Sequence, residues 1–213
     1  MRASFRLGRI AGVPVGVNWS VLVIFLLIAW GLAANQFPRA YPDRPALAYA
    51  AAGLSAAVVF FLGLLAHEVA HAVIAKRNGI AVEGITLWLF GGVSELRGEA
   101  RDPGAELRIA GIGPLVSLII GLFFGGIAML LALAGAHGLL LGSLAWLAGI
   151  NILLAIFNVL PAAPLDGGRL LRAAVWKATG DRTKASVVAA RAGWVLGALL
   201  IGLGLWQFLV GAG

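Results

Sequence analysis

The sequence predicts an all-α polytopic membrane protein of about five transmembrane helices, with one small membrane-associated β element. Of the 213 residues, 61% are hydrophobic and only 12% are charged, whereas a soluble domain carries about 25% charged residues. Five apolar runs are long enough to cross a bilayer at about 1.5 Å of rise per helical residue. Between two of these runs, hydrophobic residues nearly alternate with others, which is typical of β-strands.

The apolar runs are separated by short connections. Glycines and a proline interrupt the approach to the first run, so we interpret it as a retained helix and not as a cleavable signal. The connection 35–46 contains three prolines and is predicted to be a loop. The connection 134–138 is short and uncharged, so the helices on either side of it should form an antiparallel hairpin. The predicted spans cover about 17–34, 47–75, 109–134, 138–160 and 186–210.

The β element is predicted at residues 80–97, where apolar residues alternate around a glycine turn at Gly91 and Gly92. Residues 3–10 are candidates to join it in a small sheet. Unpaired strand edges cannot face lipid, so this element should lie at the membrane interface or line a wet cavity. A passive re-entrant loop and a substrate-binding edge are equally open interpretations.

Basic residues predict the orientation of the chain. Residues 1–16, 76–108 and 169–191 carry three, five and six of them, which is 14 of the 16 Lys and Arg residues. By the positive-inside rule, the N-terminus is cytoplasmic. This asymmetry also accounts for the net charge of +7 without a nucleic-acid partner. The chain has no cysteine, so a metal site must use His, Asp or Glu side chains.

The second span contains the motif His67-Glu68-Val69-Ala70-His71. On a helix, residues four apart share a face, so both imidazoles can reach one metal ion. Ionisable groups are costly within a membrane, and three of them in five residues need a compensating partner. A bound zinc ion and the water that it activates would supply this partner. The alternative is a pair of core histidines with satisfied hydrogen bonds.

A catalytic zinc ion normally has three protein ligands and an open position. Asp166 is the best third candidate, because it is the only acidic residue where the fourth span ends and lies on the same predicted side as the histidine pair. His137 falls on the opposite side of the membrane and is a poor candidate. The alternative for Asp166 is an ordinary turn, since Asp-Gly is a common turn pair.

Both motifs together resemble those of the site-2 protease family of intramembrane zinc metalloproteases, peptidase family M50. The similarity rests on the HExxH motif, followed about ninety residues later by Asn158-Val-Leu-Pro-Ala-Ala-Pro-Leu-Asp166-Gly. The segments Phe90–Ser94 and Gly111–Leu115 also resemble the family's membrane-associated hairpin and third-helix entry. The resemblance covers nearly the whole chain.

The resemblance implies roles for particular residues. His67, His71 and Asp166 would bind one Zn²⁺ per chain, and Glu68 would be the general base that takes a proton from the activated water. Asn158 would position the substrate or donate a hydrogen bond in the transition state, with a structural helix cap as the alternative. The further substrate-binding candidates are Gly91, Gly92, Pro161 and Pro164.

The function implied is that of an intramembrane zinc metalloendopeptidase, which cleaves a transmembrane segment of another membrane protein. The setting would be a bacterial or archaeal cell membrane, with the active site towards the cytoplasm. An edge strand near residues 80–97 could hold the unwound substrate by β-addition. A metal-ion transporter is the alternative from another class, but it gives no reason for Glu68. A catalytically inactive scaffold conflicts with the intact motif.

Members of the subgroup that this chain resembles usually have a sixth membrane helix and often carry C-terminal CBS domains. The chain stops at Gly213, directly after its fifth predicted span. We therefore expect a single metalloprotease core over residues 1–213, without the sixth helix and the CBS domains.

Overall fold

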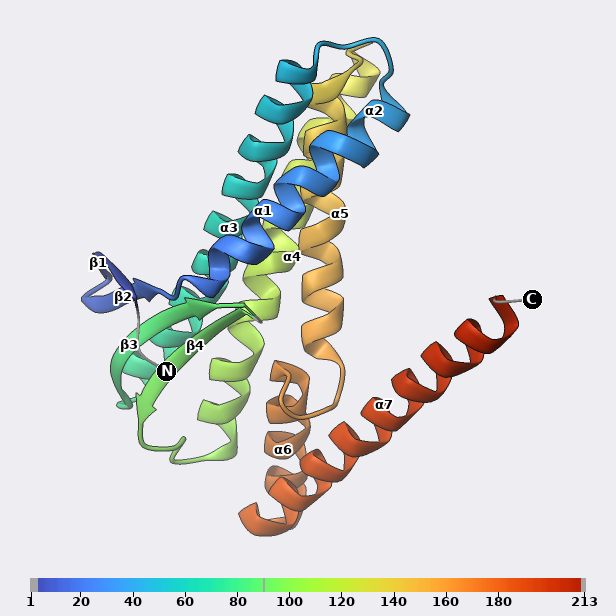
Figure 1. The fold of residues 1–213 in the computed structure, drawn as a ribbon. Helices are drawn as coiled ribbons and strands as arrows, with labels where there is room; N and C mark the ends of the chain where they lie inside the picture. The colour runs from blue at the N-terminus through green and yellow to red at the C-terminus, as the bar shows by residue number, and fades with distance from the viewer. Residues whose placement is uncertain (1–3, 90, 212–213) are drawn as a thin grey trace. The chain divides into compact units, whose positions relative to one another are not determined.

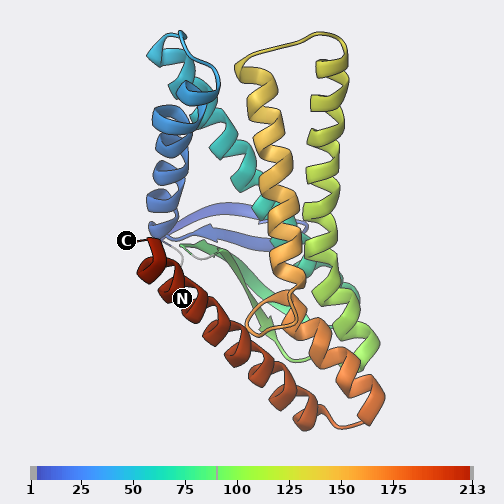
Figure 2. The same cartoon turned by 90° about the vertical axis from the view of Figure 1, so that its right-hand side faces the viewer.

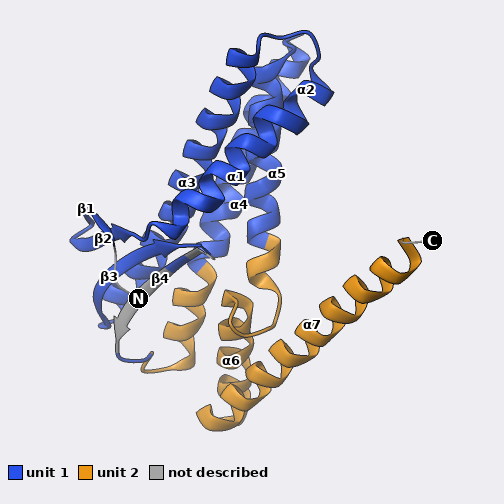
Figure 3. Cartoon of the chain, viewed as in Figure 1, with its two compact units in different colours: residues 1–99, 112–155 blue, residues 100–111, 156–213 orange. Residues whose placement is uncertain are grey.

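The computed structural model describes residues 4–89 and 91–211, apart from the side chains of residues 91 and 93–97. The chain divides into two compact units, shown in different colours in Figure 3. Unit 1 comprises residues 1–99 and 112–155, and unit 2 comprises residues 100–111 and 156–213. Each unit is described by itself.

Five long apolar helices within the described residues confirm the predicted fold class. Each is long and apolar enough to cross a membrane, and the chain is a multi-pass membrane protein. The first span covers Ser20–Ala40 and is made of α1, η1 and α2 in succession. The other spans are α3 (Ala46–Arg77), α4 (Pro103–Leu133), α5 (Leu139–Val159) and α7 (Arg182–Gly211).

The first span is longer than the sequence predicted, and the predicted loop at 35–46 is wrong over its first half. The helix α1 (Ser20–Gly31) continues through a π-helical turn, η1 (Leu32–Gln36), into α2 (Phe37–Ala40). Pro38 does not end the helix, because it follows directly on the π-helical turn η1, where the regular hydrogen-bond pattern of the α-helix is already interrupted. Phe37 is buried beside Tyr49 of α3, which holds the extra turns in place.

The predicted β element forms part of a four-stranded sheet in unit 1 (Figure 1). The order is β1-β2-β3-β4, with β2 parallel to β3 and the other two pairs antiparallel. Among the described strands, β1 and β4 are therefore the two edges of the sheet. The strands are β1 (Phe5–Ile10), β2 (Val13–Val17), β3 (Ala81–Trp88) and β4 (Gly91–Arg97).

The strand β2 was not predicted, and it connects the N-terminal segment to the sheet. Val13, Val15 and Ile85 of β3 form a buried cluster with Ala72, which packs the sheet against α3. The alternation in Val13–Val17 is the signal for this strand, but Pro14 lies inside it and its last residue joins the apolar run of the first span. Proline argues against a central strand, which is why the segment was interpreted as an interruption.

Small residues bring the spans of unit 1 close together. A side chain at Gly53 of α3 would meet the backbone of α1, and one at Gly121 of α4 would meet the backbone of α5. The helices α4 and α5 form the predicted antiparallel hairpin (Figure 2). On α4, Gly113, Ser117, Gly121 and Gly125 recur at every fourth position. Each such step turns about 40° around the helix axis, so this row faces α3 at its start and α5 at its end.

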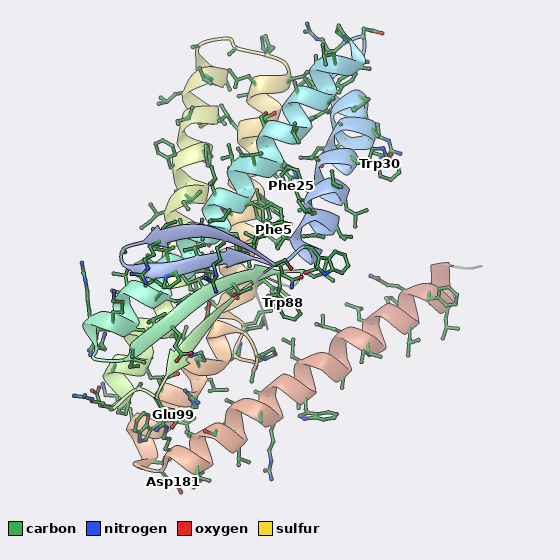
Figure 4. All side chains as sticks on the ribbon, turned by 60° about the vertical axis from the view of Figure 1, so that its left-hand side comes forward. Phe5, Phe25, Trp30, Trp88, Glu99 and Asp181 are labelled. Atoms are coloured by element: carbon green, nitrogen blue, oxygen red, sulfur yellow. The ribbon has the colours of Figure 1, made fainter. Side chains whose placement is uncertain are left out.

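The outward faces of the spans are apolar, as lipid contact requires. Trp30 projects from α1 with 67% of its surface exposed (Figure 4). Inside unit 1, Phe25 of α1 packs against Phe61 of α3 with ring centroids 5.7 Å apart. Trp30 lies near the middle of the span Ser20–Ala40, so its exposed ring is part of this apolar outer face.

Unit 2 contains α6 (Asp166–Thr179), a helix that the sequence analysis did not assign, packed against α7. The loop that precedes α6 folds back over its first turn. A side chain at Gly167 would overlap the backbone of Val159 and Leu160, and one at Gly168 would overlap the backbone of Ala162 and Ala163. A side chain at Gly193 of α7 would likewise overlap Ala163. These close contacts explain the glycine pair after Asp166.

The contact of α4 with α5 at Gly121 can be tested by mutation. In Gly121→Ala the new methyl group would lie 2.6 Å from Ile152 Cγ1 and 3.0 Å from its backbone nitrogen. We expect a loss of about 1–3 kcal/mol of stability, because a well-packed contact must open. Thermal unfolding in detergent measures it. The matched control is Gly126→Ala on the same helix, where a methyl group would meet nothing within 4 Å. An equal effect of the two substitutions would contradict this packing.

Candidate metal centre

The two histidines of the HExxH motif lie side by side on α3, inside unit 1. His67 is 3% exposed and His71 is 6% exposed. Their Nε2 atoms are 3.1 Å apart, and their rings are nearly perpendicular with centroids 4.8 Å apart. The four-residue spacing on α3 therefore brings the two Nε2 atoms close together.

The arrangement fits a bound metal ion. Two nitrogens that each lie 2.0–2.1 Å from a tetrahedral zinc ion are about 3.3 Å apart, close to the spacing of the two Nε2 atoms. Gly113 of α4 keeps the adjacent space open, because a Cβ atom there would overlap both Nε2 atoms. Two imidazole nitrogens beside a position that only a glycine leaves open are suitable donors for Zn²⁺.

Ser117 of α4 orients one of the two imidazoles. Its hydroxyl oxygen lies 2.9 Å from Nδ1 of His67, and Ser117 is fully buried. When Nδ1 donates its proton to this oxygen, the lone pair of Nε2 is directed towards His71. Ligating histidines usually have such a partner on the second nitrogen, which fixes the tautomer and the ring orientation.

Glu68 is half-buried and lies against the edge strand β4. A Cβ atom at Gly92 would overlap Cγ and Cδ of Glu68, so any other residue there would force the Glu68 side chain to move. Unit 1 thus brings together His67, Glu68, His71 and Gly92 of the predicted site, with the neighbouring Gly91 starting the same strand.

The remaining predicted site residues lie in unit 2. Asn158 is the penultimate residue of α5, and Asp166 is the first residue of α6. Pro161 and Pro164 lie in the loop between these helices. The predicted roles of these four residues, as metal ligand or as substrate contacts, stay predictions.

Gly113 and Ser117 are functional candidates to which the sequence analysis gave no role. The segment Gly111–Leu115 was identified only as the entry of a helix. Nothing local marks Ser117, because serine is common within membrane helices. The only available signal was the four-residue spacing from Gly113, which places both residues on neighbouring parts of one helix face.

Comparison with known proteins agrees with this geometry. The model of peptidase family M50 matches residues 55–138 and 125–201, which include the HExxH motif and Asp166. The chain belongs to peptidase family M50. Among the curated relatives, "Putative zinc metalloprotease Rip3" of Mycobacterium tuberculosis is 49% identical over 99% of this chain and 53% of its own length. "Zinc metalloprotease MJ0392" of Methanocaldococcus jannaschii is 31% identical over 96% of this chain and 55% of its own length.

The M50 chain described here spans about half the length of these curated relatives. A solved structure, "Site-2 Protease from Methanocaldococcus jannaschii", matches with a TM-score of 0.64 and 28% identity. The match covers 97% of this chain and 87% of the solved one. The family and fold that the sequence resembled are therefore confirmed.

The role of Ser117 gives a test of the metal centre. In Ser117→Ala, Nδ1 of His67 loses its partner, and we expect Zn²⁺ affinity to fall about 10–100-fold, as for other residues that orient metal ligands. Competition with a chromophoric chelator measures this affinity. The matched control is Ser55→Ala on α3, whose hydroxyl donates only to the backbone of Ala52. Parental affinity in Ser117→Ala would show that the hydroxyl does not orient the ligand.

Proposed function

We propose that this chain is an intramembrane zinc metalloendopeptidase that cleaves a transmembrane segment of another membrane protein. The observation that supports this most directly is the pair of buried imidazoles on α3, with Nε2 atoms 3.1 Å apart and a carboxylate at the next residue. The HExxH motif fits hydrolysis better than ion transport, because a transport site gives no reason for a glutamate, Glu68, between the two histidines.

We propose His67, His71 and Asp166 as the ligands of one zinc ion per chain. In support, two ligands leave a catalytic zinc ion incomplete, and Asp166 is the only acidic residue between Asn151 and Thr179. The matched relatives are named zinc metalloproteases, and the family match runs through residues of both units. We therefore propose that the two units act together as one protease core.

The chain's own residues would handle the protons of the reaction. When bound, zinc would supply Lewis-acid chemistry, which polarises a peptide carbonyl and makes water a stronger nucleophile. The Glu68 carboxylate would accept the proton of the attacking water and then deliver it to the leaving amine nitrogen. Asn158 would donate a hydrogen bond to the carbonyl oxygen as negative charge develops there. A helix cap at the end of α5 is the alternative role for Asn158.

The substrate would be held as a strand along β4. A helical segment hides its peptide bonds, so it must unwind before attack. An unwound segment can add to an exposed sheet edge through main-chain hydrogen bonds, and β4 has no second neighbour among the described strands. Gly92 brings this strand against Glu68, so a segment paired with β4 would run near the proposed base. Gly91, Pro161 and Pro164 are proposed as further contacts.

Glu68→Gln tests the proposed reaction. The amide cannot accept the water's proton, so cleavage of a reporter with a Gly- and Pro-containing transmembrane helix should fall by about 10²–10⁴-fold. Zinc content and thermal stability should stay near those of the parent. Cleavage products in detergent micelles and bound zinc are measured on the same samples.

Three results would count against the proposed reaction. Cleavage by Glu68→Gln at the parental rate would remove the proposed base. Zinc flux into vesicles that is equal for the parent and Glu68→Gln, with no proteolysis by either, would favour the transporter. No flux and no proteolysis by a zinc-loaded parent would favour the inactive scaffold.

The proposed role of β4 predicts a position-dependent effect of proline. Proline removes a backbone donor and clashes with strand pairing, so a scan of residues 91–97 should find positions that lower cleavage without loss of zinc. Only about every other amide points outwards, so several positions are needed. The same scan over residues 5–10 of β1 is the matched control, because β1 is the other edge of the sheet. Equal results for both strands would leave β4 as a structural element only.

We propose that the N-terminus and the active-site side face the cytoplasm. Because the parent has no cysteine, single cysteines report accessibility without background. Arg77→Cys, at the end of α3, should react with an impermeant maleimide only in inside-out vesicles. Ala40→Cys, at the end of α2, should react only in right-side-out cells. The reverse pattern would overturn the orientation.

A further inference from the structure

Glu106 is a buried carboxylate that no part of the proposed reaction uses. It lies in the first turn of α4, inside unit 2, and is 1% exposed. Its Oε1 atom accepts hydrogen bonds from Arg169 Nε at 3.0 Å and from Arg172 Nη2 at 2.6 Å. A buried carboxylate needs partners of this kind, because a charge without them is expensive to bury.

Both arginines lie on α6, the helix that begins at Asp166. Asp166, Arg169 and Arg172 follow at intervals of three residues, so they occupy successive turns of one helix face. Two hydrogen bonds from successive turns to one oxygen fix the rotation of α6 about its own axis. Leu170 of α6 lies near Gly111 of α4, where an added Cβ atom would be 3.7 Å from its Cδ2.

The start of α6 needs such an anchor. Its N-cap residue, Leu165, makes no side-chain capping hydrogen bond, and Gly167 and Gly168 are poor helix formers. The preceding loop covers these glycines and limits how far the first turn can shift. The two arginines, one and two turns after Asp166, limit how far it can rotate.

We propose that Glu106 is a positioning residue that presents the Asp166 carboxylate to the metal in one orientation. This proposal rests on the proposed function, in which Asp166 is a zinc ligand. Glu106 would act in two ways through its arginines. First, it fixes the rotation of the first turn of α6. Second, it holds the guanidinium of Arg169, which is one turn from Asp166. A guanidinium that was not held in this way could bind the Asp166 carboxylate and compete with the metal.

The test uses the full chain and has one readout that involves no metal. In Glu106→Gln, backbone amides in the first two turns of α6 should exchange hydrogen for deuterium at least about tenfold faster in the zinc-free protein, because the anchor of the helix is weakened. Zinc affinity, measured by chelator competition, should fall about 10–100-fold. Arg169→Gln keeps the hydrogen bond between Arg172 and Glu106, so its exchange rate and zinc affinity should change in the same direction but by less. This variant replaces Glu106→Gln in the test if Glu106→Gln does not fold.

Asp102→Ala is the matched control. Asp102 Oδ1 accepts a hydrogen bond from the backbone of Ala105 at 2.9 Å and caps the same helix, four residues before Glu106. Its loss should lower thermal stability but leave the exchange of α6 and the zinc affinity at parental values. The double variant Glu106→Gln/Arg169→Gln should be no worse than Glu106→Gln alone, because both changes break one unit.

The possible outcomes separate this proposal from the proposed function. If Asp166→Ala loses zinc while Glu106→Gln and Arg169→Gln keep parental affinity, the ligand stands and the positioning role is overturned. If Asp102→Ala weakens zinc binding as much as Glu106→Gln does, the effect is general destabilisation and the positioning role is again overturned. If Asp166→Ala keeps parental zinc affinity, the proposed ligand set fails and the positioning role fails with it.

Discussion

An imidazole buried between membrane helices must find its polar partners inside the protein, because lipid cannot supply them. In unit 1, His67 and His71 meet this requirement through neighbouring side chains. Each imidazole has the other beside it, and His67 has the Ser117 hydroxyl as well. The space next to both Nε2 atoms exists because α4 has no side chain at Gly113. The sheet completes these surroundings, since Gly92 allows β4 to pass directly against Glu68.

Much of the fold follows from local pattern in the sequence. Long uncharged runs predicted the five spans, and alternation predicted the strands at 81–97. The errors arose where two patterns overlap. Pro38 suggested a loop but lies within the helical first span, and Pro14 concealed the strand β2, one of whose two partners is about seventy residues away. The amphipathic helix α6 was missed because its arginines had already been interpreted as determinants of orientation.

In the candidate site too, some residues could be predicted from local pattern and others could not. His67, Glu68 and His71 could be found from spacing alone, because helical geometry places residues four apart on one face. Ser117 and Glu106 could not, because their partners are 50 and about 65 residues away in sequence. Such partners depend on how the helices pack, which no local pattern encodes. The glycines at 113 and 92 are visible in the sequence, but their purpose follows only from the atoms that a side chain would displace.

The row of small residues on α4 has a consequence for how this protein can change over time. Gly113 and Ser117 shape the candidate metal centre, while Gly121 and Gly125, on the same row, allow α5 to approach. The same four-residue spacing therefore serves the candidate metal centre at one end of the row and the packing of α4 against α5 at the other. Substitutions that fill gaps between helices are a common route to greater stability. At the start of this row, such a substitution would fill the space beside the imidazoles. Selection for a tighter helix bundle and selection for an open reaction space therefore oppose each other along a single face of one helix.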